Sequence, residues 1–295
     1  MPELPDIVVY LEALERRIVG AKLERIRVVS PSVLRTYAPT IGDVEGHRVV
    51  GLRRIGKRIV WHLEDNLFIV IHLMVAGRLR WGDPGAAVPK KVGLAAFDFP
   101  DATLVFTEAS QKKRASIHLL RGEEAVAAID PGSLEPLTMT VEEFSAALQG
   151  QNRTLQRALT DSKSLSGIGN AYSDEILFRA HLSPLQLTHR LDSAAIVALY
   201  NSTQAVLIEW TDLLRSEVGE GWPEKVTAFR PEMAVHGKHG EPCPVCGSPV
   251  QRIVYASNET NYCATCQTGG RLLADRARSR LLKGSRPKRI EDLGG

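Results

Sequence analysis

The sequence has no long apolar run and very few cysteines. No stretch of it is apolar over the about 20 residues that a membrane-spanning helix needs. The N-terminus carries Glu3 and Asp6 where a secretory signal has its basic residues, and no apolar segment follows them. No internal repeat and no extended low-complexity segment is visible. We therefore expect a cytoplasmic protein, of a bacterial-type cytosol or nucleoid, with no membrane partner.

The composition is that of an ordinary globular protein whose basic character is local. At 295 residues, 44% apolar and 24% charged, the chain suits two domains or one domain with appendages. The net charge is +3, but residues 271–295 hold eight Lys or Arg against three Asp or Glu, which leaves −2 for the remaining 270 residues. A basic segment of this kind fits a patch that meets phosphates. The alternative is a solvated, disordered tail, which we favour for residues 284–295.

Short strands at regular intervals in the first half predict a β-sandwich. An apolar stripe first predicts a helix over residues 5–19, which Gly20 ends. We expect this helix to cover one edge of the sandwich and to bring Pro2 to a cleft. The expected strands cover residues 23–29, 48–54, 58–63, 67–73, 78–81, 92–99, 103–107 and 115–120.

The second half is predicted to be helical as far as about residue 219. The expected helices cover residues 141–148, 153–159, 170–180 and 193–215. Thr140 serves as the N-cap of the first of these helices, and Glu143 completes a capping box. A loop rich in glycine, proline and charge then leads to the cysteines.

All four cysteines lie within 24 residues, at Cys243, Cys246, Cys263 and Cys266. Their C-x2-C-x16-C-x2-C spacing is typical of a tetrahedral zinc site on a β-hairpin, and four thiolates leave no open coordination position. We therefore predict one structural Zn²⁺, with Gly247 allowing the backbone to turn around the metal. A redox-active dithiol is the alternative.

Two further segments suggest chemistry. If Met1 is removed, Pro2 becomes the N-terminus, and an α-amine titrates near about 8, so a useful fraction is unprotonated at neutral pH. Such an amine attacks an electrophilic carbon and forms an iminium; alternatively, the prolines only stiffen a helix start.

The second segment, Gly167-Ile-Gly169-Asn170, permits a tight turn before a helix, whose N-terminus can hold a phosphate. The alternative is a turn that merely joins two helices.

In combination, these motifs resemble the formamidopyrimidine-DNA glycosylase/endonuclease VIII family. The resemblance rests on the N-terminal Pro2-Glu3-Leu4-Pro5, the Gly-Ile-Gly-Asn segment and the four-cysteine finger, in that order and spacing, and it covers residues 1 to about 267. It implies an α+β fold with an N-terminal β-sandwich and helix, then a helical domain with a helix–two-turn–helix motif and a β-hairpin zinc finger. We expect domains at residues 1–130, 131–235 and 236–270, and a basic tail at 271–295.

The resemblance also implies an activity and the residues that perform it. The chain would be a bifunctional DNA glycosylase and abasic-site lyase of base excision repair, which cuts the strand by β,δ-elimination. Pro2 resembles the family's nucleophile, Glu3 its acid/base, and Lys57 a catalytic-domain lysine on the lesion strand. Asn170, together with Gly169, matches the phosphate contact of the helix–two-turn–helix. Damaged DNA is the expected partner of a protein that we expect to be a monomer.

Several positions depart from the family's pattern. Asp6 stands where the family usually has Glu, and Val75 stands where it has the methionine that fills the gap left by the flipped base, with Met74 one place early. The family's second loop that fills this gap has no Phe here and carries Lys112, Lys113 and Arg114. We expect these side chains to contact phosphate or an orphan base; the alternative is that the loop is simply solvated.

The expected phosphate contacts of the second half are also altered. Gln156 replaces a lysine, with Arg153 and Arg157 nearby, and Asn258 replaces the finger-tip arginine. The loop 219–235 lacks the pattern of oxidised-guanine specialists. These changes motivate an alternative function, a zinc-finger protein that binds damaged or abasic DNA without excision.

Overall fold

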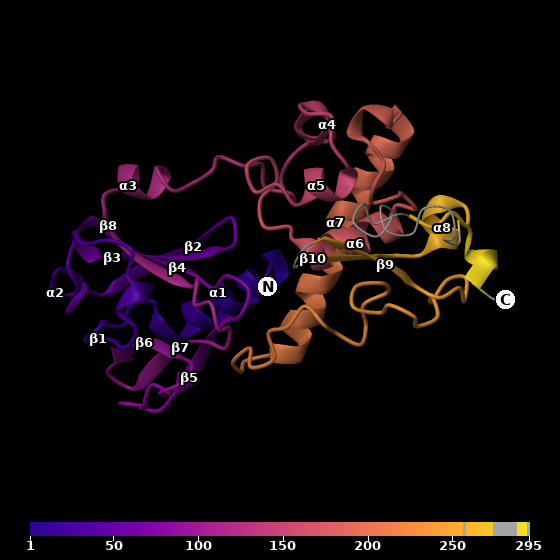
Figure 1. Ribbon diagram of the computed structural model, residues 1–295. Coiled ribbons are helices and arrows are strands. Elements are labelled where there is room, and N and C mark those ends of the chain that lie inside the picture. The colour runs from indigo at the N-terminus through magenta and orange to yellow at the C-terminus, as the bar shows by residue number, and fades with distance from the viewer. Residues whose placement is uncertain (256–257, 274–287, 294–295) are drawn as a thin grey trace. The chain divides into compact units, whose positions relative to one another are not determined.

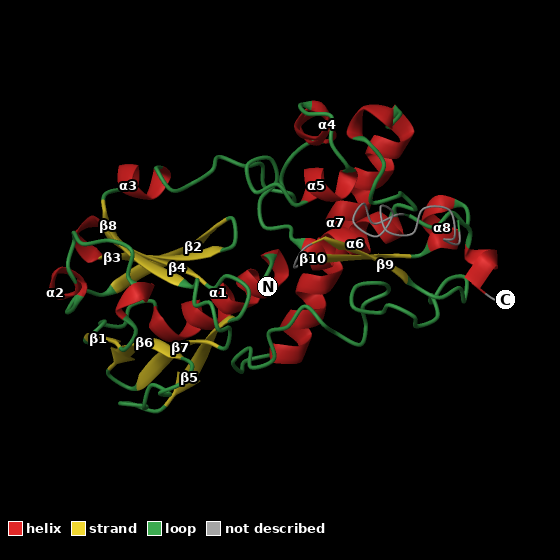
Figure 2. Ribbon diagram, viewed as in Figure 1, coloured by secondary structure: helices red, strands yellow, loops and turns green. Residues whose placement is uncertain are grey.

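The computed structural model describes residues 1–255, 258–273 and 288–293. The chain forms two compact units, one from Met1–Gly132 with Trp210–Thr227 and the other from Ser133–Glu209 with Ala228–Gly295 (Figure 1). The first unit contains two four-stranded sheets, and the second contains most of the helices and a two-stranded hairpin (Figure 2). The fold class is therefore α+β, as the sequence predicted.

The two sheets of the first unit are antiparallel throughout. Their strand orders are β2-β3-β4-β8 and β1-β6-β7-β5. The strands are β1 (Arg25–Val28), β2 (Val49–Ile55), β3 (Arg58–Leu63), β4 (Leu67–His72), β5 (Gly77–Gly82), β6 (Gly93–Phe99), β7 (Ala102–Glu108) and β8 (Ser116–Arg121). Each strand lies within a few residues of its predicted place, because each is a short apolar or alternating run that turn signals bound.

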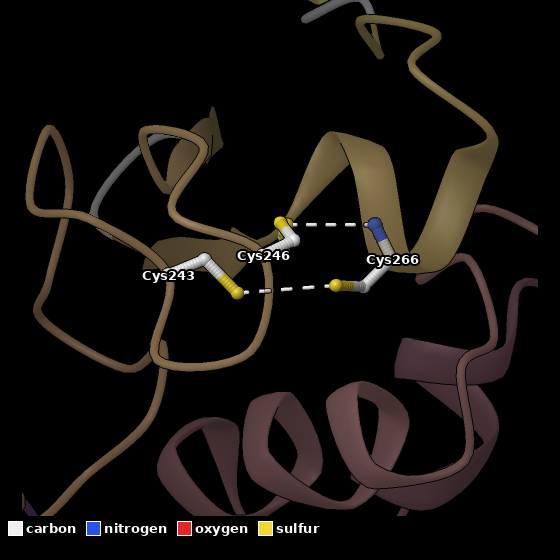
Figure 3. Close-up of side chains that lie close together, drawn as sticks. Cys243, Cys246 and Cys266 are labelled. Atoms are coloured by element: carbon white, nitrogen blue, oxygen red, sulfur yellow. Dashed lines mark hydrogen bonds between the residues drawn. The ribbon is translucent and has the colours of Figure 1, made fainter.

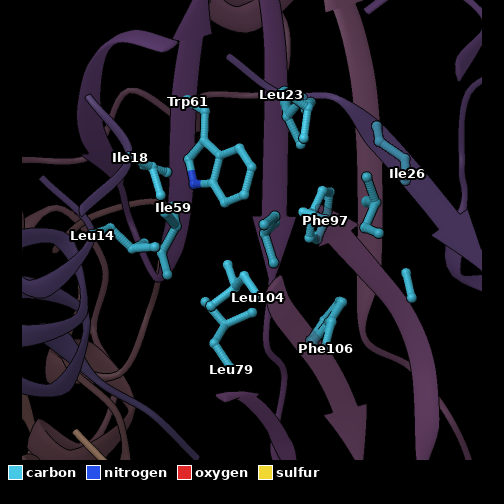
Figure 4. Packing of buried hydrophobic residues seen from close by; sticks show 14 of the residues in the cluster. Leu14, Ile18, Leu23, Ile26, Ile59, Trp61, Leu79, Phe97, Leu104 and Phe106 are labelled. Carbon is cyan, nitrogen blue, oxygen red and sulfur yellow. The ribbon is translucent and has the colours of Figure 1, made fainter. Parts of the chain in front are cut away.

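The core of the first unit lies between the two sheets. Trp61 of β3 is fully buried and packs against Phe97 of β6, with ring centroids 4.8 Å apart (Figure 4). Helix α1 (Leu4–Ile18) packs along β2, an edge strand, and adds Leu14 and Ile18 to the same core. The β-sandwich with its N-terminal helix is thus confirmed, and burial of one apolar stripe determines which face of α1 packs on the sandwich.

The outer face of the β2-β3-β4-β8 sheet carries a smaller apolar cluster. Val60, Phe68 and Val70 of this face pack with Val126 of α3 (Glu123–Ala127). Both faces of β4 are therefore largely covered, which explains its almost continuous apolar sequence. The remaining short elements of this unit are η1 (Pro31–Val33), α2 (Ile41–Val44) and η2 (Glu64–Asn66).

The segment Trp210–Thr227 is held on the first unit by aromatic and charged contacts. It contains the end of the long helix α7 (Ser193–Val218). Trp222 donates its indole N–H to the carbonyl of Leu79 at 3.0 Å, and the guanidinium of Arg17 lies 5.7 Å from the centre of the Trp222 ring. Arg215 makes a two-pronged ion pair with Glu12, with nitrogen–oxygen distances of 2.9 and 2.6 Å. These contacts explain why this part of α7 belongs to the first unit.

The second unit consists of helices and the finger hairpin. Its elements are α4 (Val141–Gln149), α5 (Leu155–Leu159), α6 (Asn170–Arg179), η3 (Thr188–Arg190), the first part of α7, β9 (Gln251–Tyr255), β10 (Asn258–Tyr262), α8 (Ala264–Thr268) and η4 (Ile290–Leu293). Thr140 caps α4 by accepting a hydrogen bond from the amide of Glu143, and the predicted capping box is present.

A buried polar network joins α6 to the finger. Glu175 accepts hydrogen bonds from the amides of Ala234, Val235 and His236, each at 2.9 Å. The carboxylate of Asp174 accepts from the amide of Asn261 on β10 and lies 2.8 Å from Nδ1 of His236. Burial raises the pKa of Asp174 to about 7. The network orders the segment that leads into the cysteines.

The C-terminal segment differs in part from the sequence expectation. We favoured a solvated, disordered tail for residues 284–295; residues 288–292 are largely exposed, but the expected disorder is wrong for residues 288–293. The amide of Ile290 donates to the carbonyl of Gly270, and that of Leu272 donates to Lys288, each at 2.8 Å. Ile290 also packs on a cluster that includes Ile253 of β9. Residues 284–287 and 294–295 lie outside the described residues.

Candidate active site and metal centre

The helix start at the N-terminus is built around two buried carboxylates. Glu3 is the N-cap of α1 and has an extended backbone, with φ −120° and ψ −171°. Its amide donates to Oδ2 of Asp6 at 2.9 Å, and its own carboxylate accepts from the amide of Asp6, which completes a capping box. Both side chains are almost fully buried. Asp6, a departure in the sequence, thus helps to fix the backbone beside Pro2.

The structure brings the N-terminal amine, Glu3 and Lys57 into one electrostatic environment. Burial lowers the pKa of the amine at Met1, Arg78 and Lys57 lower it further, and Glu3 and Asp6 oppose the shift. Burial also lowers the pKa of Lys57, against the charge of Glu3. A buried amine beside cations is more often unprotonated and is therefore a better nucleophile. No sequence motif pointed to Arg78, a residue of β5 whose charge acts on the amine.

In the turn between β4 and β5, Met74 and Val75 differ in backbone conformation and in exposure to solvent. Met74 has a positive φ of 53°, a conformation that suits glycine, and Val75 at the tip is 58% exposed. The turn closes on Gly77, where a Cβ atom would lie 2.2 Å from the carbonyl oxygen of Leu73. Val75 is therefore the more accessible apolar side chain of the pair.

The loop after β7 is organised by Glu108, a residue that the sequence analysis did not single out. Its buried carboxylate accepts from Ser110 Oγ at 2.6 Å and from the amides of Arg114 and Ala115 at 2.8 and 3.0 Å. The loop presents Arg114 on the surface and leaves Lys113 half-buried. Neither side chain is ion-paired within the described part of the chain. The sequence signal for the role of Glu108 in ordering this loop is a carboxylate that directly precedes a run of basic residues.

In the second unit, α5 and α6 face each other across the glycine-rich turn. Gly167 has a φ of 77°, and Gly169 is the N-cap of α6. Asn170 begins the helix, and its Oδ1 accepts a hydrogen bond from Nε2 of Gln156 at 3.3 Å. This contact turns the Nδ2 group of Asn170 away from Gln156 and leaves it as a donor. Gln156, which stands where the family has a lysine, therefore has a role as a hydrogen-bond donor to Asn170.

The two arginines near Gln156 have different environments. Arg153 is half-buried and paired with Asp161 at 2.6 Å, so its charge is locally neutralised. Arg157 lies exposed in the last turn of α5, and no described residue forms an ion pair with it. Of the two, Arg157 is the one available to an external anion.

Two of the four cysteines, Cys243 and Cys246, lie in one loop, and the other two lie at the start of α8, with Cys263 as its N-cap. Figure 3 shows Cys243, Cys246 and Cys266 around one space. All four sulfur atoms lie within 4.8 Å of one another. The Cys243–Cys266 and Cys246–Cys263 sulfur distances are 3.9 and 3.4 Å. Zinc–sulfur bonds of about 2.3 Å in a tetrahedron require sulfur atoms about 3.8 Å apart, so this arrangement fits one zinc ion. Gly247 has a φ of 74°, in keeping with its expected place in the knuckle.

Three family models match successive parts of the chain. The formamidopyrimidine-DNA glycosylase N-terminal domain matches residues 1–115, and the H2TH domain of the same enzymes matches residues 130–214. A zinc finger found in these glycosylases and in isoleucyl-tRNA synthetases matches residues 240–269. The cofactor is accordingly one structural zinc ion, bound by the four cysteines.

Named relatives agree with these matches. Formamidopyrimidine-DNA glycosylases from Heliobacterium modesticaldum and Listeria monocytogenes are 30% and 29% identical, and each match covers 90% of this chain and 100% of the relative. An uncharacterised formamidopyrimidine-DNA glycosylase-like protein of Mycobacterium tuberculosis is 40% identical over 155 residues, which is 52% of this chain.

Solved structures give the same result. A Lactococcus lactis enzyme bound to Fapy-dG-containing DNA superposes with a TM-score of 0.79 at 25% identity, covering 90% of this chain and 100% of that one. A MutM complex with carbocyclic 8-oxo-G DNA superposes with a TM-score of 0.81, also at 25% identity and with the same coverage. None of the described helices is long and apolar enough to cross a membrane. With full-length relatives and all three family domains in order, the chain belongs to the formamidopyrimidine-DNA glycosylase/endonuclease VIII family of DNA glycosylases.

Proposed function

We propose that the protein is a bifunctional DNA glycosylase and abasic-site lyase of base excision repair. The observation that carries this proposal is the N-terminus, where burial lowers the pKa of the Met1 amine and of Lys57 and the charge of Glu3 acts on both groups. Removal of Met1 would expose the amine of Pro2 to these surroundings. A function in base excision repair accords with the family, and the lyase step is our inference from the site. A cytoplasmic location and a monomeric state remain predictions.

The chemistry assigned to the site begins with the nitrogen of Pro2 after Met1 is removed. The nitrogen lone pair attacks C1′ of the damaged nucleotide, and the bond from C1′ to the base breaks, so that the base leaves with that electron pair and takes up the proton that the nitrogen gives up. Glu3 donates a proton as the sugar ring opens, which leaves an iminium between Pro2 and C1′. Loss of a C2′ proton expels the 3′ phosphate, a second elimination expels the 5′ phosphate, and water releases the sugar fragment.

The remaining predicted residues would hold the DNA strand. Lys57 would contact the lesion strand, and Asn170 with Gly169 would bind a phosphate at the start of α6. Arg157, Lys113 and Arg114 would add contacts to phosphates or to the orphan base. Extrusion of a base requires an apolar wedge in the stack. We assign the wedge to the turn of Met74 and Val75, since the tip of that turn exposes an apolar side chain.

A lesion panel with borohydride trapping tests the proposal. Purified protein, whose intact mass shows whether Met1 is absent, is incubated with duplexes that carry an abasic site, an oxidised purine or an oxidised pyrimidine. We expect a covalent adduct and strand cleavage, both lost in Glu3→Gln. Specific binding without an adduct on any lesion would contradict the proposal and would favour the alternative, a protein that binds damaged DNA without excision.

A further inference from the structure

Two connections between the sheets of the first unit lie at the same end of the sandwich. Residues 73–76 lead from β4 in one sheet to β5 in the other, and residues 109–115 lead from β7 back to β8. The last residue of β4 pairs with the first residue of β8, and Gly77, the first residue of β5, pairs with Glu108, the last residue of β7. The two connections, here called the first and the second crossover, therefore lie side by side.

Glu108 stands at the point where the two crossovers meet. Its backbone pairs with Gly77, which closes the first crossover. Its buried carboxylate accepts hydrogen bonds from the hydroxyl of Ser110 and from the amides of Arg114 and Ala115, at opposite ends of the second crossover. Ala115 is itself buried in the core between the sheets. The carboxylate thus connects both ends of the second crossover to the strand end beside the first.

The first crossover is tightly closed at its base. The amide of Gly77 donates to the carbonyl of Leu73 at 2.8 Å, and a Cβ atom at Gly77 would lie 2.2 Å from that oxygen. Nη1 of Arg78 donates to the carbonyl of Gly77 at 2.6 Å. At the tip of this crossover Val75 is 58% exposed. The exposed apolar side chain is therefore carried on a closed turn whose base is paired with Glu108.

The second crossover carries three cations, Lys112, Lys113 and Arg114, which repel one another. Within the described part of the chain, neither these three side chains nor Glu108 forms an ion pair. The carboxylate of Glu108 binds backbone amides, so it offsets the charge of the crossover and orders its backbone without engaging the cationic side chains. The crossover is ordered, and its cations stay available to a partner.

We propose that Glu108 is a positioning residue for base extrusion, which holds the second crossover against the first so that both enter the duplex as one unit. An apolar wedge separates stacked bases only if its support is rigid, because a support that yields relaxes instead of the stack. Hydrogen bonds to a carboxylate are stronger than bonds between neutral groups, which suits such a support. The inference rests on the proposed function, since it takes the turn of Met74 and Val75 as the wedge.

The rate at which the duplex opens tests this role. The probe is a duplex with 2-aminopurine opposite a non-cleavable abasic analogue, because the fluorescence of 2-aminopurine rises when the base unstacks. Stopped-flow at saturating protein gives the rate for the wild type, Glu108→Gln, Val75→Ala and the double variant. Glu108→Gln keeps the shape of the side chain and removes its charge, so we expect the rate to fall about 10- to 100-fold. Because both changes act on one unit, the double variant should be about as slow as the slower single variant.

Glu45→Gln is the matched control. Glu45 is a half-buried carboxylate of the same unit that accepts a hydrogen bond from the amide of Ile26 at 2.7 Å, and it belongs to neither crossover. Its substitution should keep the wild-type rate and leave the effect of Val75→Ala unchanged. Thermal unfolding verifies that each variant is folded. If Glu108→Gln does not fold, Ser110→Ala replaces it, because it removes one donor to the same carboxylate and should slow opening about 2- to 10-fold.

The possible failures are distinguishable. A purely structural role of Glu108 would lower thermal stability and leave the opening rate of the folded variant at the wild-type value, which would refute the proposal. Effects of Glu108→Gln and Val75→Ala that simply multiply would refute the coupling of the crossovers. A wild type that gives no fluorescence change would overturn the assigned wedge and this inference together. If the fluorescence changes but no borohydride adduct forms, the proposed function fails, while the opening rates still decide the role of Glu108.

Discussion

The hydrogen bond between Gln156 and Asn170 gives a prediction whose size follows from the structure. Nε2 of Gln156 donates to Oδ1 of Asn170 over 3.3 Å in a partly buried position. A neutral hydrogen bond of this kind contributes about 0.5–1.5 kcal/mol. We expect that without it the side-chain amide of Asn170 would rotate and its donor would no longer be held for the proposed phosphate contact. We therefore expect Gln156→Ala to weaken DNA binding by about 2- to 12-fold, although Gln156 carries no charge.

A double-mutant cycle isolates this effect. Affinities of wild type, Gln156→Ala, Asn170→Ala and the double variant are measured by fluorescence anisotropy on a duplex with an abasic analogue. We expect a coupling energy of about 0.5–1.5 kcal/mol, and the salt slope of Gln156→Ala should equal that of the wild type. Gln156→Lys, by contrast, should raise the salt slope by about 0.9. A coupling energy of zero would refute the positioning role of Gln156.

Four other predictions address the finger, the wedge turn, the C-terminus and the active-site amine. A strong chelator should remove one zinc ion per chain, measured by elemental analysis, and abolish DNA binding, which zinc should restore. Gly77→Ala should lower the free energy of unfolding by about 1–3 kcal/mol, because its Cβ would overlap Leu73, whereas Gly51→Ala, which meets nothing within 4 Å, should change it little. Ile290→Ala should lower the same free energy by about 1 kcal/mol, because the half-buried side chain packs on the finger; an unchanged value would mean that residues 288–293 do not dock there. Burial and Arg78 lower the pKa of the Met1 amine, and we expect the same surroundings to act on the amine of Pro2 once Met1 is removed. Cleavage should then rise with pH through a lowered α-amine pKa, and Arg78→Gln should move that rise to higher pH.

Much of the fold was predictable from the types of residues and their near neighbours in the sequence. Strand β3 was predicted over residues 58–63 and has these bounds, because its residues are largely apolar and turns flank it. The cap of α4 by Thr140 and the positive φ of Gly247 likewise follow from residue type and neighbours. The metal centre was predictable because the cysteine spacing alone defines a coordination geometry.

The parts that could not be predicted depend on contacts between distant segments. Helix α3 begins at Gly122 without a side-chain cap and packs through Val126 on a sheet face formed elsewhere in the sequence. Residues 288–293 have a mostly charged sequence with two cations and two carboxylates, and their order comes from pairing with residues 270–272.

The same holds for the residues around the candidate site. Gln156 and Asn170 are separated by the whole glycine-rich turn, and the sequence contains no signal that they meet. Gly77 and Glu108 become neighbours only through strand register. Sequence patterns therefore predicted the motifs, while the electrostatic environment of each motif required the fold.

The most direct test of the central claim is to map the covalent adduct. Protein trapped with borohydride on abasic DNA is digested, and the peptide that carries the sugar remnant is sequenced by mass spectrometry. We expect the remnant on the nitrogen of Pro2, in a chain that has lost Met1, and no adduct with Glu3→Gln. A remnant on Lys57 or another lysine, or no adduct from folded, zinc-loaded protein, would contradict the account.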